Sequence, residues 1–221
     1  MTNVPLILHR IVNKLIKRLG MYRDRTIRYA GFFTQFIGSE GVVLDIGCGS
    51  GIFSKLLAKG ERMVIALDIQ EDFLRRMKST NINIHKVCAD AHYLPFRDDS
   101  VDYVLSISLI EHLRKPEMHI VDVYRVLRKK AVWIIQLPNL QYLIEPHTKW
   151  PLLYLMPKQL QLKILELSKC PDVNMKVVAK YVLELLHKTG FEIVMIKKVY
   201  HVNIMKLIPI APSLIFVARK T

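Results

Sequence analysis

Short apolar runs alternate with segments of helical periodicity from residue 42 onward. The apolar runs predict five strands, at 42–46, 63–68, 82–87, 101–107 and 131–137. Apolar residues three and four positions apart predict helices between them, at 51–59, 71–79 and 116–128. Strands that alternate with helices are typical of a parallel sheet covered on both faces. The pattern therefore predicts a doubly wound α/β fold.

The alternation stops after the fifth strand. Prolines interrupt the next stretch, which is rich in Leu, Tyr and Trp, so we expect an insertion of short helices over 140–172. A helix at about 174–188 and two strands at about 191–202 and 212–219 follow. The short connection between these strands favours an antiparallel hairpin. The whole chain thus predicts a Rossmann-like, seven-stranded, mostly parallel sheet with an antiparallel last strand.

Residues 4–19 predict an amphipathic N-terminal helix with Arg10, Lys14, Lys17 and Arg18 around its polar side. Because these charges interrupt the apolar residues and no small-residue cleavage site follows, the segment does not resemble a secretory signal. No apolar run in the chain reaches the roughly 18 residues that a membrane-spanning helix needs. We expect a cytoplasmic protein that is soluble, or at most peripheral to a membrane.

Basic residues give the chain a net charge of +14, and their distribution is uneven. Residues 1–30 hold seven Lys/Arg and one Asp, whereas residues 31–139 hold fourteen Lys/Arg and thirteen Asp/Glu. The excess therefore lies outside the predicted α/β core. It would suit an acidic substrate, nucleic acid or an anionic lipid surface, or it could serve solubility alone. The three cysteines, Cys48, Cys88 and Cys170, are too far apart to predict a disulfide framework, and we predict no metal site.

The sequence from Val43 to Gly51 carries the clearest chemical signal, because glycines occupy three alternate positions directly after a predicted strand. Glycine tolerates positive φ and has no side chain to hold a ligand away from the backbone amides. A dinucleotide-binding fingerprint spaces its glycines Gly-x-Gly-x-x-Gly. Here the spacing is Gly-x-Gly-x-Gly, preceded by Asp45. The ligand that this loop predicts is a nucleotide-like cofactor.

Acidic residues also follow the next strands. Asp68 ends the second predicted strand, where a short carboxylate can accept hydrogen bonds from the two hydroxyls of a ribose. That position would fit a nicotinamide dinucleotide equally well. The third strand leads into Asp90-Ala91, and the fourth leads through Ser106 into Glu111-His112-Leu113.

Together, Val43–Gly51 and these later segments resemble, in order and in spacing, the motifs of class I S-adenosylmethionine-dependent methyltransferases. Leu94-Pro95-Phe96 and Glu111-His112-Leu113 look most like the small-molecule branch, which includes the ubiquinone- and menaquinone-biosynthesis enzymes. The resemblance implies that S-adenosylmethionine is bound and S-adenosylhomocysteine is released. It places the amino-acid end of the cofactor near Asp45 and the adenine near Asp90-Ala91. The implied cofactor-binding set is Asp45, Gly47, Cys48, Gly49, Gly51, Asp68, Ile69, Asp90, Ala91 and Ser106.

The resemblance covers about residues 40–137, and because a chain of 221 residues fits one α/β domain better than two, we expect a single methyltransferase domain over residues 1–221. We divide it into a basic N-terminal segment, a cofactor-binding core, a helical insertion or lid, and a C-terminal helix with closing strands: 1–30, 40–139, 140–172 and 173–221.

Methyl transfer is an in-line displacement, so the protein must hold the acceptor close and remove its proton where its pKa demands a base. The candidates for that base are Glu111 and His112 at the carboxyl end of the fourth strand, and His147 in the insertion with Glu145 nearby. Each has a structural alternative. Glu111 and His112 could cap a helix or line the cofactor pocket, and His147 could pack on Trp150.

The sequence lacks the motifs of several other methyltransferase branches. No Asn-Pro-Pro-Tyr motif follows the fourth strand, no Pro-Cys pair occurs, and Glu111 alone could match a paired-glutamate site. We therefore expect a small-molecule or lipid-like acceptor beneath the apolar stretch 150–157. That stretch and the helix at 4–19 could touch an anionic membrane, or both could pack on the sheet or on another subunit.

Two other functions stay open. One is an RNA methyltransferase, in which residues 1–30 would bind phosphates. The other is a non-catalytic module that would bind S-adenosylmethionine and a partner protein. An NAD-linked oxidoreductase fits the glycine spacing poorly. The sequence predicts no particular oligomeric state.

Overall fold

The computed structural model of the chain describes residues 29, 31–78, 82–141, 147–148, 150, 152–200, 211 and 213–221. The helix predicted at 4–19 lies outside the described residues, as does nearly all of the basic segment 1–30. So do residues 142–146 of the insertion and the end of the strand predicted at 191–202.

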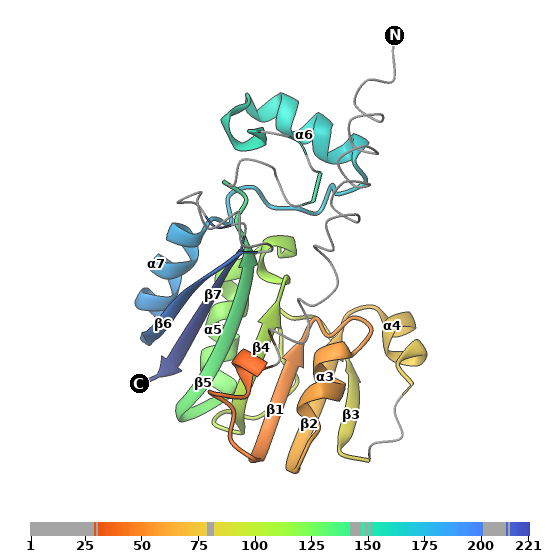
Figure 1. The fold of residues 1–221 in the computed structure, drawn as a ribbon, viewed down its shortest axis with the longest axis vertical. Coiled ribbons are helices and arrows are strands. Elements are labelled where there is room, and N and C mark those ends of the chain that lie inside the picture. Colours follow the sequence, from red (N-terminus) through yellow and green to blue (C-terminus); the bar gives the residue numbers. More distant parts are fainter. Residues whose placement is uncertain are drawn as a thin grey trace.

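Seven strands form one sheet, as the sequence predicts: β1 (Glu40–Ile46), β2 (Glu61–Asp68), β3 (Ile84–Cys88), β4 (Val101–Ile107), β5 (Leu127–Pro138), β6 (Phe191–Val199) and β7 (Ser213–Lys220). Their order is β3-β2-β1-β4-β5-β7-β6 (Figure 1). Strands β1 to β5 are mutually parallel, and β7 runs antiparallel to β5 and β6. The predicted hairpin and antiparallel last strand are confirmed, with β7 inside the sheet and β6 at its edge.

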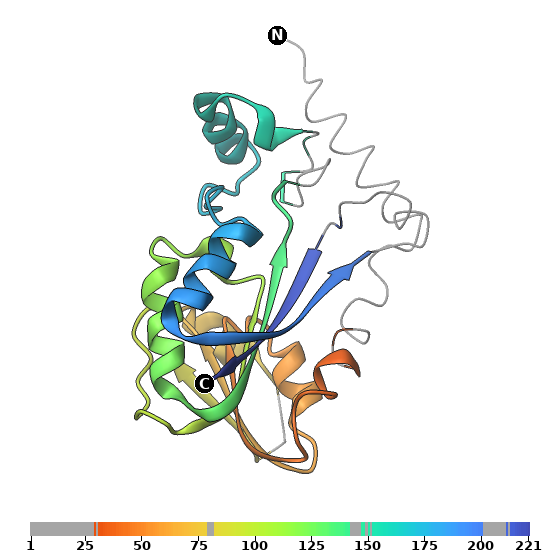
Figure 2. The ribbon, with the colours of Figure 1, turned by 90° about the vertical axis from the view of Figure 1, so that its left-hand side faces the viewer.

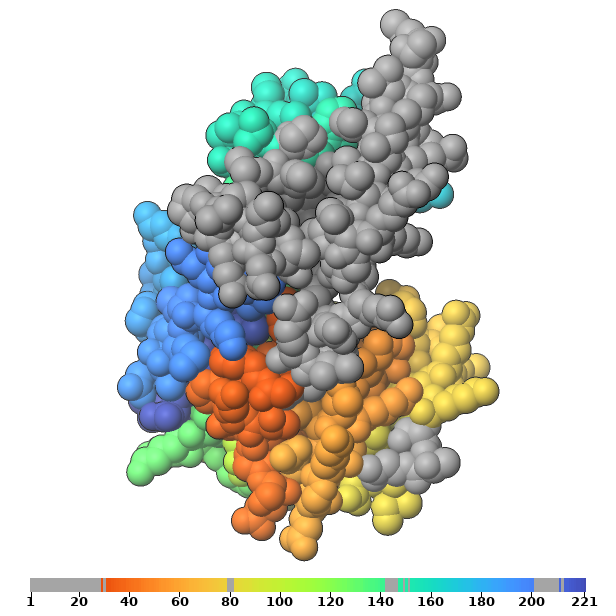
Figure 3. All heavy atoms as spheres, in the orientation of Figure 1, coloured from red at the N-terminus to blue at the C-terminus, as the bar shows by residue number. Residues whose placement is uncertain are grey.

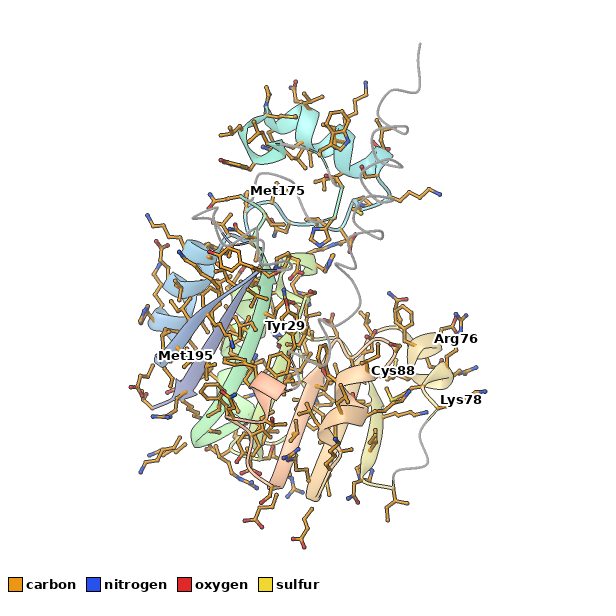
Figure 4. The ribbon with its side chains drawn as sticks, in the orientation of Figure 1. Tyr29, Arg76, Lys78, Cys88, Met175 and Met195 are labelled. Atoms are coloured by element: carbon orange, nitrogen blue, oxygen red, sulfur yellow. The ribbon has the colours of Figure 1, made fainter. Side chains whose placement is uncertain are left out.

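Helices cover both faces of the sheet (Figure 2). Helices α5 (Pro116–Val126) and α7 (Ala179–Thr189) bury their apolar sides with Trp133 and Phe191 on one face. On the other face, Phe32 and Phe33 pack in one cluster with Leu57 of α3 (Ile52–Leu57), and the red-orange segment 31–37 lies beside the orange α3 in Figure 3. Tyr29 belongs to the same cluster and lies over the middle of the sheet in Figure 4. Because both faces are covered, β4 and β5 read as near-continuous apolar runs.

Two element boundaries differ most from the sequence prediction. Strand β5 begins at Leu127, not at 131, because Leu127 pairs with Val101 before the register shifts, and Lys130 has a left-handed φ of 64°. Helix α7 begins at Ala179, not at 174. There the backbone amide of Asn174 donates instead to the carbonyl oxygen of Glu111, at 2.7 Å. At both boundaries, backbone groups pair with residues that are far away in the chain. The periodicity of apolar residues cannot predict such pairing.

The insertion contains the 3₁₀ turn η2 (Leu153–Leu155) and the helix α6 (Lys158–Leu167), which lies above the carboxyl ends of the strands in Figure 1. It has a small core of its own, in which Leu140, Leu153 and Leu165 are buried. Met175, labelled in Figure 4, packs against this core from the segment between α6 and α7. Among the residues that the structure describes, every helix is too short or too polar to cross a bilayer.

Candidate active site

The glycine loop after β1 folds onto the end of β2. The backbone amides of Gly47 and Cys48 both donate to the carbonyl oxygen of Leu67, at 2.8 and 3.0 Å. Gly47, Gly49 and Gly51 all have positive φ, between 51° and 70°. A Cβ atom built on Gly49 would meet nothing within 4 Å, because this glycine borders open space. The loop thus presents bare backbone to the cavity beside it.

Asp68 is fixed at the end of β2 by two backbone amides. Gly49 donates to Oδ2 and Gln70 donates to Oδ1, each at 2.9 Å. The side chain is buried, yet it lines the cavity. Because each carboxylate oxygen has about two acceptor sites, both oxygens keep one for a ligand hydroxyl. This arrangement fits the predicted contact with a ribose.

The cavity has a volume of about 700 Å³, which lies within the range of small-molecule and cofactor sites. Six members of the predicted cofactor set line it: Gly47, Gly49, Asp68, Ile69, Asp90 and Ala91. Sequence reasoning missed several further lining residues, namely Gln70, Phe73, Ser108, Leu109, Leu113 and Arg114. The exposed apolar side chains of Ile69 and Phe73 offer a surface on which a flat ring could lie.

Asp90 is held in a tight turn by His92. The backbone amide of His92 donates to Asp90 Oδ1 at 2.9 Å, and His92 Nδ1 lies 2.6 Å from the same oxygen. Burial raises the pKa of Asp90, but the two hydrogen bonds and the charge of His92 outweigh burial, so its pKa lies below the ordinary value. Asp90 therefore lines the cavity as a carboxylate.

Asp45 lies beneath the loop and does not line the cavity. It is buried, and its Oδ2 accepts a hydrogen bond from Ser54 Oγ of α3 at 2.5 Å. Burial raises its pKa to about 6, while the hydrogen bonds with Ser54 act in the opposite direction. Asp45 thus joins β1 to α3 underneath the glycine loop, and its part in the site is to support that loop.

Cys48 and Gly51 also support the loop from outside the cavity. Cys48 packs with Ala66, Leu74 and Met77, and burial raises the pKa of its thiol far above the usual range. A Cβ atom on Gly51 would come within 2.5 Å of Met77 Sδ. Both positions shape the turn through packing.

Ser106, which the sequence predicts to contact the cofactor, lies in the interior of the sheet and does not line the cavity. Its Oγ accepts from Trp133 Nε1 at 3.1 Å and lies 3.3 Å from His119 Nε2. His119 Nδ1 in turn lies 2.8 Å from the carbonyl oxygen of Ala91 in the cavity wall. Burial lowers the pKa of His119 to about 4, so the imidazole is neutral at pH 7. Ser108, two positions further on, lines the cavity in place of Ser106.

The three predicted catalytic residues lie close together, and one of them, His112, lines the cavity. Glu111 and His112 belong to the 3₁₀ turn η1 (Ile110–His112), and His147 comes from the insertion. One ligand-type atom from each lies within 4.8 Å of the others. The rings of His112 and His147 meet edge to face, with their centroids 5.3 Å apart. Glu111 is fully buried, whereas His112 lines the cavity.

Asp172 is the acidic partner of this cluster that sequence reasoning missed. His112 Nδ1 lies 2.6 Å from Asp172 Oδ2, and Asp172 also lines the cavity. Glu145, the partner predicted for His147, lies outside the described residues. Asp172 follows α6, far from His112 in the chain, and only its place directly after Pro171, at the end of the insertion, marks it in the sequence.

Two glycine substitutions should separate the shape of the loop from its access to the ligand. Gly51→Ala should lower the free energy of unfolding by about 1–3 kcal/mol, because the new methyl group meets Met77 at a left-handed φ. Gly49→Ala should cost only the conformational strain, about 1 kcal/mol, yet weaken cofactor binding about tenfold by placing a methyl group in the cavity. Urea unfolding and calorimetric titration with S-adenosylhomocysteine measure the two effects. If the two variants lost the same cofactor affinity and the same unfolding free energy, the distinction between Gly51 and Gly49 would be wrong.

The strand order, the glycine loop and the paired amides on Asp68 define the class of protein as an α/β domain whose cavity has the glycine loop and a fixed carboxylate in its wall. Residues 44–135 match the family model described as a methyltransferase domain. Over these residues the chain is similar to that family, and its fold agrees with the fold of class I S-adenosylmethionine-dependent methyltransferases.

Individual relatives agree with this assignment. The chain is 29% identical over 136 residues to a protein of Mycolicibacterium smegmatis named as a probable S-adenosylmethionine-dependent methyltransferase, covering 62% of this chain and 52% of the relative. It is 35% identical over 92 residues to a ubiquinone biosynthesis O-methyltransferase of Hydrogenovibrio crunogenus, covering 38% of each. The chain therefore spans about half, or less, of these relatives' lengths.

Solved structures share the fold over most of the chain. An S-adenosylmethionine-dependent methyltransferase from Mesorhizobium loti has a TM-score of 0.71 at 18% identity, covering 90% of this chain and 100% of that one. The PH0226 protein of Pyrococcus horikoshii has a TM-score of 0.67 at 26% identity, covering 90% and 91%.

Proposed function

We propose that this protein transfers a methyl group from S-adenosylmethionine to an oxygen or nitrogen atom of a small-molecule or lipid-like acceptor. The observation that carries the proposal is one cavity whose wall includes Gly49 and Asp68 at one end, and His112 and Asp172 at the other. Methyl transfer needs the donor and the acceptor in one continuous cavity, because the reacting atoms must approach each other in line.

The residues present fit the cofactor. Asp68 would hold the ribose hydroxyls, Asp90 and Ile69 would hold the adenine, and the amides beside Gly47 and Gly49 would face the amino-acid end. When bound, S-adenosylmethionine supplies a methyl group made electrophilic by its sulfonium. The part of the chain itself would be to hold the acceptor in line with that methyl group. Asp68 is prepared to hold the ribose, because its backbone hydrogen bonds already set its orientation.

The acceptor should lose its proton at the cluster of Glu111, His112 and His147. His112 lines the cavity, and its contact with Asp172 fixes the orientation of its ring. Carboxylate and imidazole groups at this end can take a proton or strengthen an acceptor's tendency to lose one. We therefore assign Glu111, His112 and His147 to the removal of a proton from the acceptor, and not to cofactor binding.

The insertion supports an apolar acceptor. Leu155, Leu160, Leu162 and Leu167 expose their side chains near Lys158 and Lys163. We propose that 140–172 acts as a lid over the acceptor, and that its leucines and lysines contact an anionic membrane where the acceptor is a lipid. The relative from Hydrogenovibrio crunogenus, by name an O-methyltransferase of ubiquinone biosynthesis, gives support for an oxygen acceptor of low polarity.

Incubation with S-adenosylmethionine that carries a radiolabelled methyl group, together with fractionated cell extract, tests the function. We expect label in an organic-soluble or small-molecule fraction, and suppression of labelling by added S-adenosylhomocysteine. Label in RNA alone would favour the nucleic-acid alternative, in which affinity falls steeply with salt. Cofactor binding without label in any fraction would favour a non-catalytic module and contradict the proposal.

A further inference from the structure

We propose that Glu111, His112 and His147 form a binding site for one divalent transition-metal cation, of the class of Zn²⁺, Co²⁺ or Mn²⁺, at the end of the cavity away from the glycine loop. The site rests on the geometry of these residues alone. Its role beside the methyl acceptor rests on the proposed function.

The first argument is the convergence of three ligand-type side chains. A carboxylate oxygen and two imidazole nitrogens lie within 4.8 Å of one another. Within the described part of the chain, no other group of three His, Cys, Asp or Glu residues meets in this way. The residues come from the turn after β4 and from the insertion, so the fold itself brings them together.

The donor atoms indicate which cations would bind. Two imidazoles with one carboxylate suit zinc and other first-row divalent metals, whereas Mg²⁺ and Ca²⁺ prefer oxygen ligands. Three protein ligands also leave coordination positions for water or a substrate, as in catalytic zinc sites. Because His112 lines the cavity, those positions would be reached from the cavity.

Asp172 gives an independent second observation. Its Oδ2 lies 2.6 Å from His112 Nδ1, an ion-pair contact that occupies this nitrogen and makes Nε2 the proposed ligand atom. Nε2 is the nitrogen that faces Glu111, at 3.9 Å from Oε1. A carboxylate that orients a histidine in this manner is the usual outer support of a metal ligand. The His112 ring is therefore prepared to bind a cation through Nε2.

The backbone around Glu111 is also fixed before any cation binds. Its carbonyl oxygen accepts from the amide of Asn174 at 2.7 Å, and the amide of His112 donates to Leu109 at 2.9 Å. Two of the three ligands thus belong to a rigid turn. His147, only partly buried, is the ligand that we expect to move.

The movement required is small. Metal–nitrogen distances of about 2.0–2.1 Å place neighbouring ligand atoms roughly 3.4 Å apart in a tetrahedral site. The present separations of up to 4.8 Å would shorten by about 1.5 Å at most, which rotation of the His147 side chain can supply. Beside a methyl acceptor, the cation would lower the pKa of an acceptor hydroxyl.

Metal binding to the purified, metal-free full chain tests this site. Equilibrium dialysis with Zn²⁺ and the visible absorption of Co²⁺ should show one equivalent bound. His147→Ala and Glu111→Gln should weaken binding at least about tenfold, and Asp172→Asn about 10- to 100-fold through loss of the support for His112. The matched control is His85→Ala, because His85 is an exposed imidazole on β3 and should leave binding unchanged.

Absence of Co²⁺ and Zn²⁺ binding, or binding that survives both His147→Ala and Glu111→Gln, would overturn the inference. If Glu111→Gln fails to fold, the partly exposed His147 decides the question alone, with circular dichroism to confirm its fold. Titration with S-adenosylhomocysteine and label transfer, both in the presence of a chelator, separate this inference from the proposed function. If both persist while no cation binds, the metal site alone is wrong.

Discussion

Asp68→Ala is expected to weaken binding of S-adenosylhomocysteine by about 1.5–3 kcal/mol, or roughly 10- to 150-fold. Hydrogen bonds to a charged acceptor account for this magnitude, since the carboxylate would hold both ribose hydroxyls. The same substitution also removes the acceptor for the amide of Gly49, so the glycine loop loses one of its fixed points. Both effects act in the same direction.

Isothermal titration calorimetry measures this loss. Asp68→Asn keeps one acceptor oxygen and should fall between the wild type and the alanine variant. The matched control is Asp72→Ala, since Asp72 is an exposed acid on α4 (Glu71–Arg76) that pairs with Arg76. Unchanged affinity in Asp68→Ala would show that the ribose is not bound at the end of β2.

The second large effect is a pair of opposed pH dependences, one from Asp45 and one from His119. Burial raises the pKa of Asp45 from 3.8 to about 6, so between these values the folded state binds more protons than the unfolded state. The free energy of unfolding therefore falls by about 3 kcal/mol as the pH rises through this window. Burial lowers the pKa of His119 from 6.5 to about 4, so its contribution rises by about 3 kcal/mol over nearly the same window.

In the wild type these two contributions should nearly cancel between about pH 4 and 6. Asp45→Asn should expose the His119 dependence, so its stability should rise with pH relative to the wild type. His119→Asn, which keeps a donor for the carbonyl of Ala91, should show the reverse. Urea unfolding of the three proteins across this pH range gives the differences. Parallel stability curves for all three would refute the assignment.

The fold could be predicted from the sequence because its signals are local. A buried parallel strand needs a run of apolar residues, and the runs at 42–46 and 101–107 meet that need almost to the residue. The glycine loop was equally visible, since positive φ at three alternate positions leaves glycine as the unstrained choice. Asp68 followed from its place at the carboxyl end of a strand.

The rest of the site depends on long-range geometry. Ser106 and Ser108 point the same way along an ideal strand, and only the turn at Ser108, with a φ of 50°, separates a buried hydroxyl from a cavity residue. Asp172 reaches His112 because the insertion folds back toward η1, which no local pattern encodes. His119 lies in the amphipathic helix α5, and no local pattern marks its contact with the carbonyl oxygen of Ala91 in the cavity wall.

The place of β7 between β5 and β6 has a consequence for folding kinetics. Lys220 of β7 donates to the carbonyl oxygen of Leu127, 93 positions earlier, and Trp133 of β5 pairs with Ala218. During synthesis, β5 therefore emerges long before its outer neighbour and presents an open strand edge in the meantime. Pairing between strands so far apart in the chain is slow. The step in which β7 pairs with β5 should therefore limit the rate of folding. The parallel half of the sheet, β1 to β4, makes its own pairings without waiting for that step.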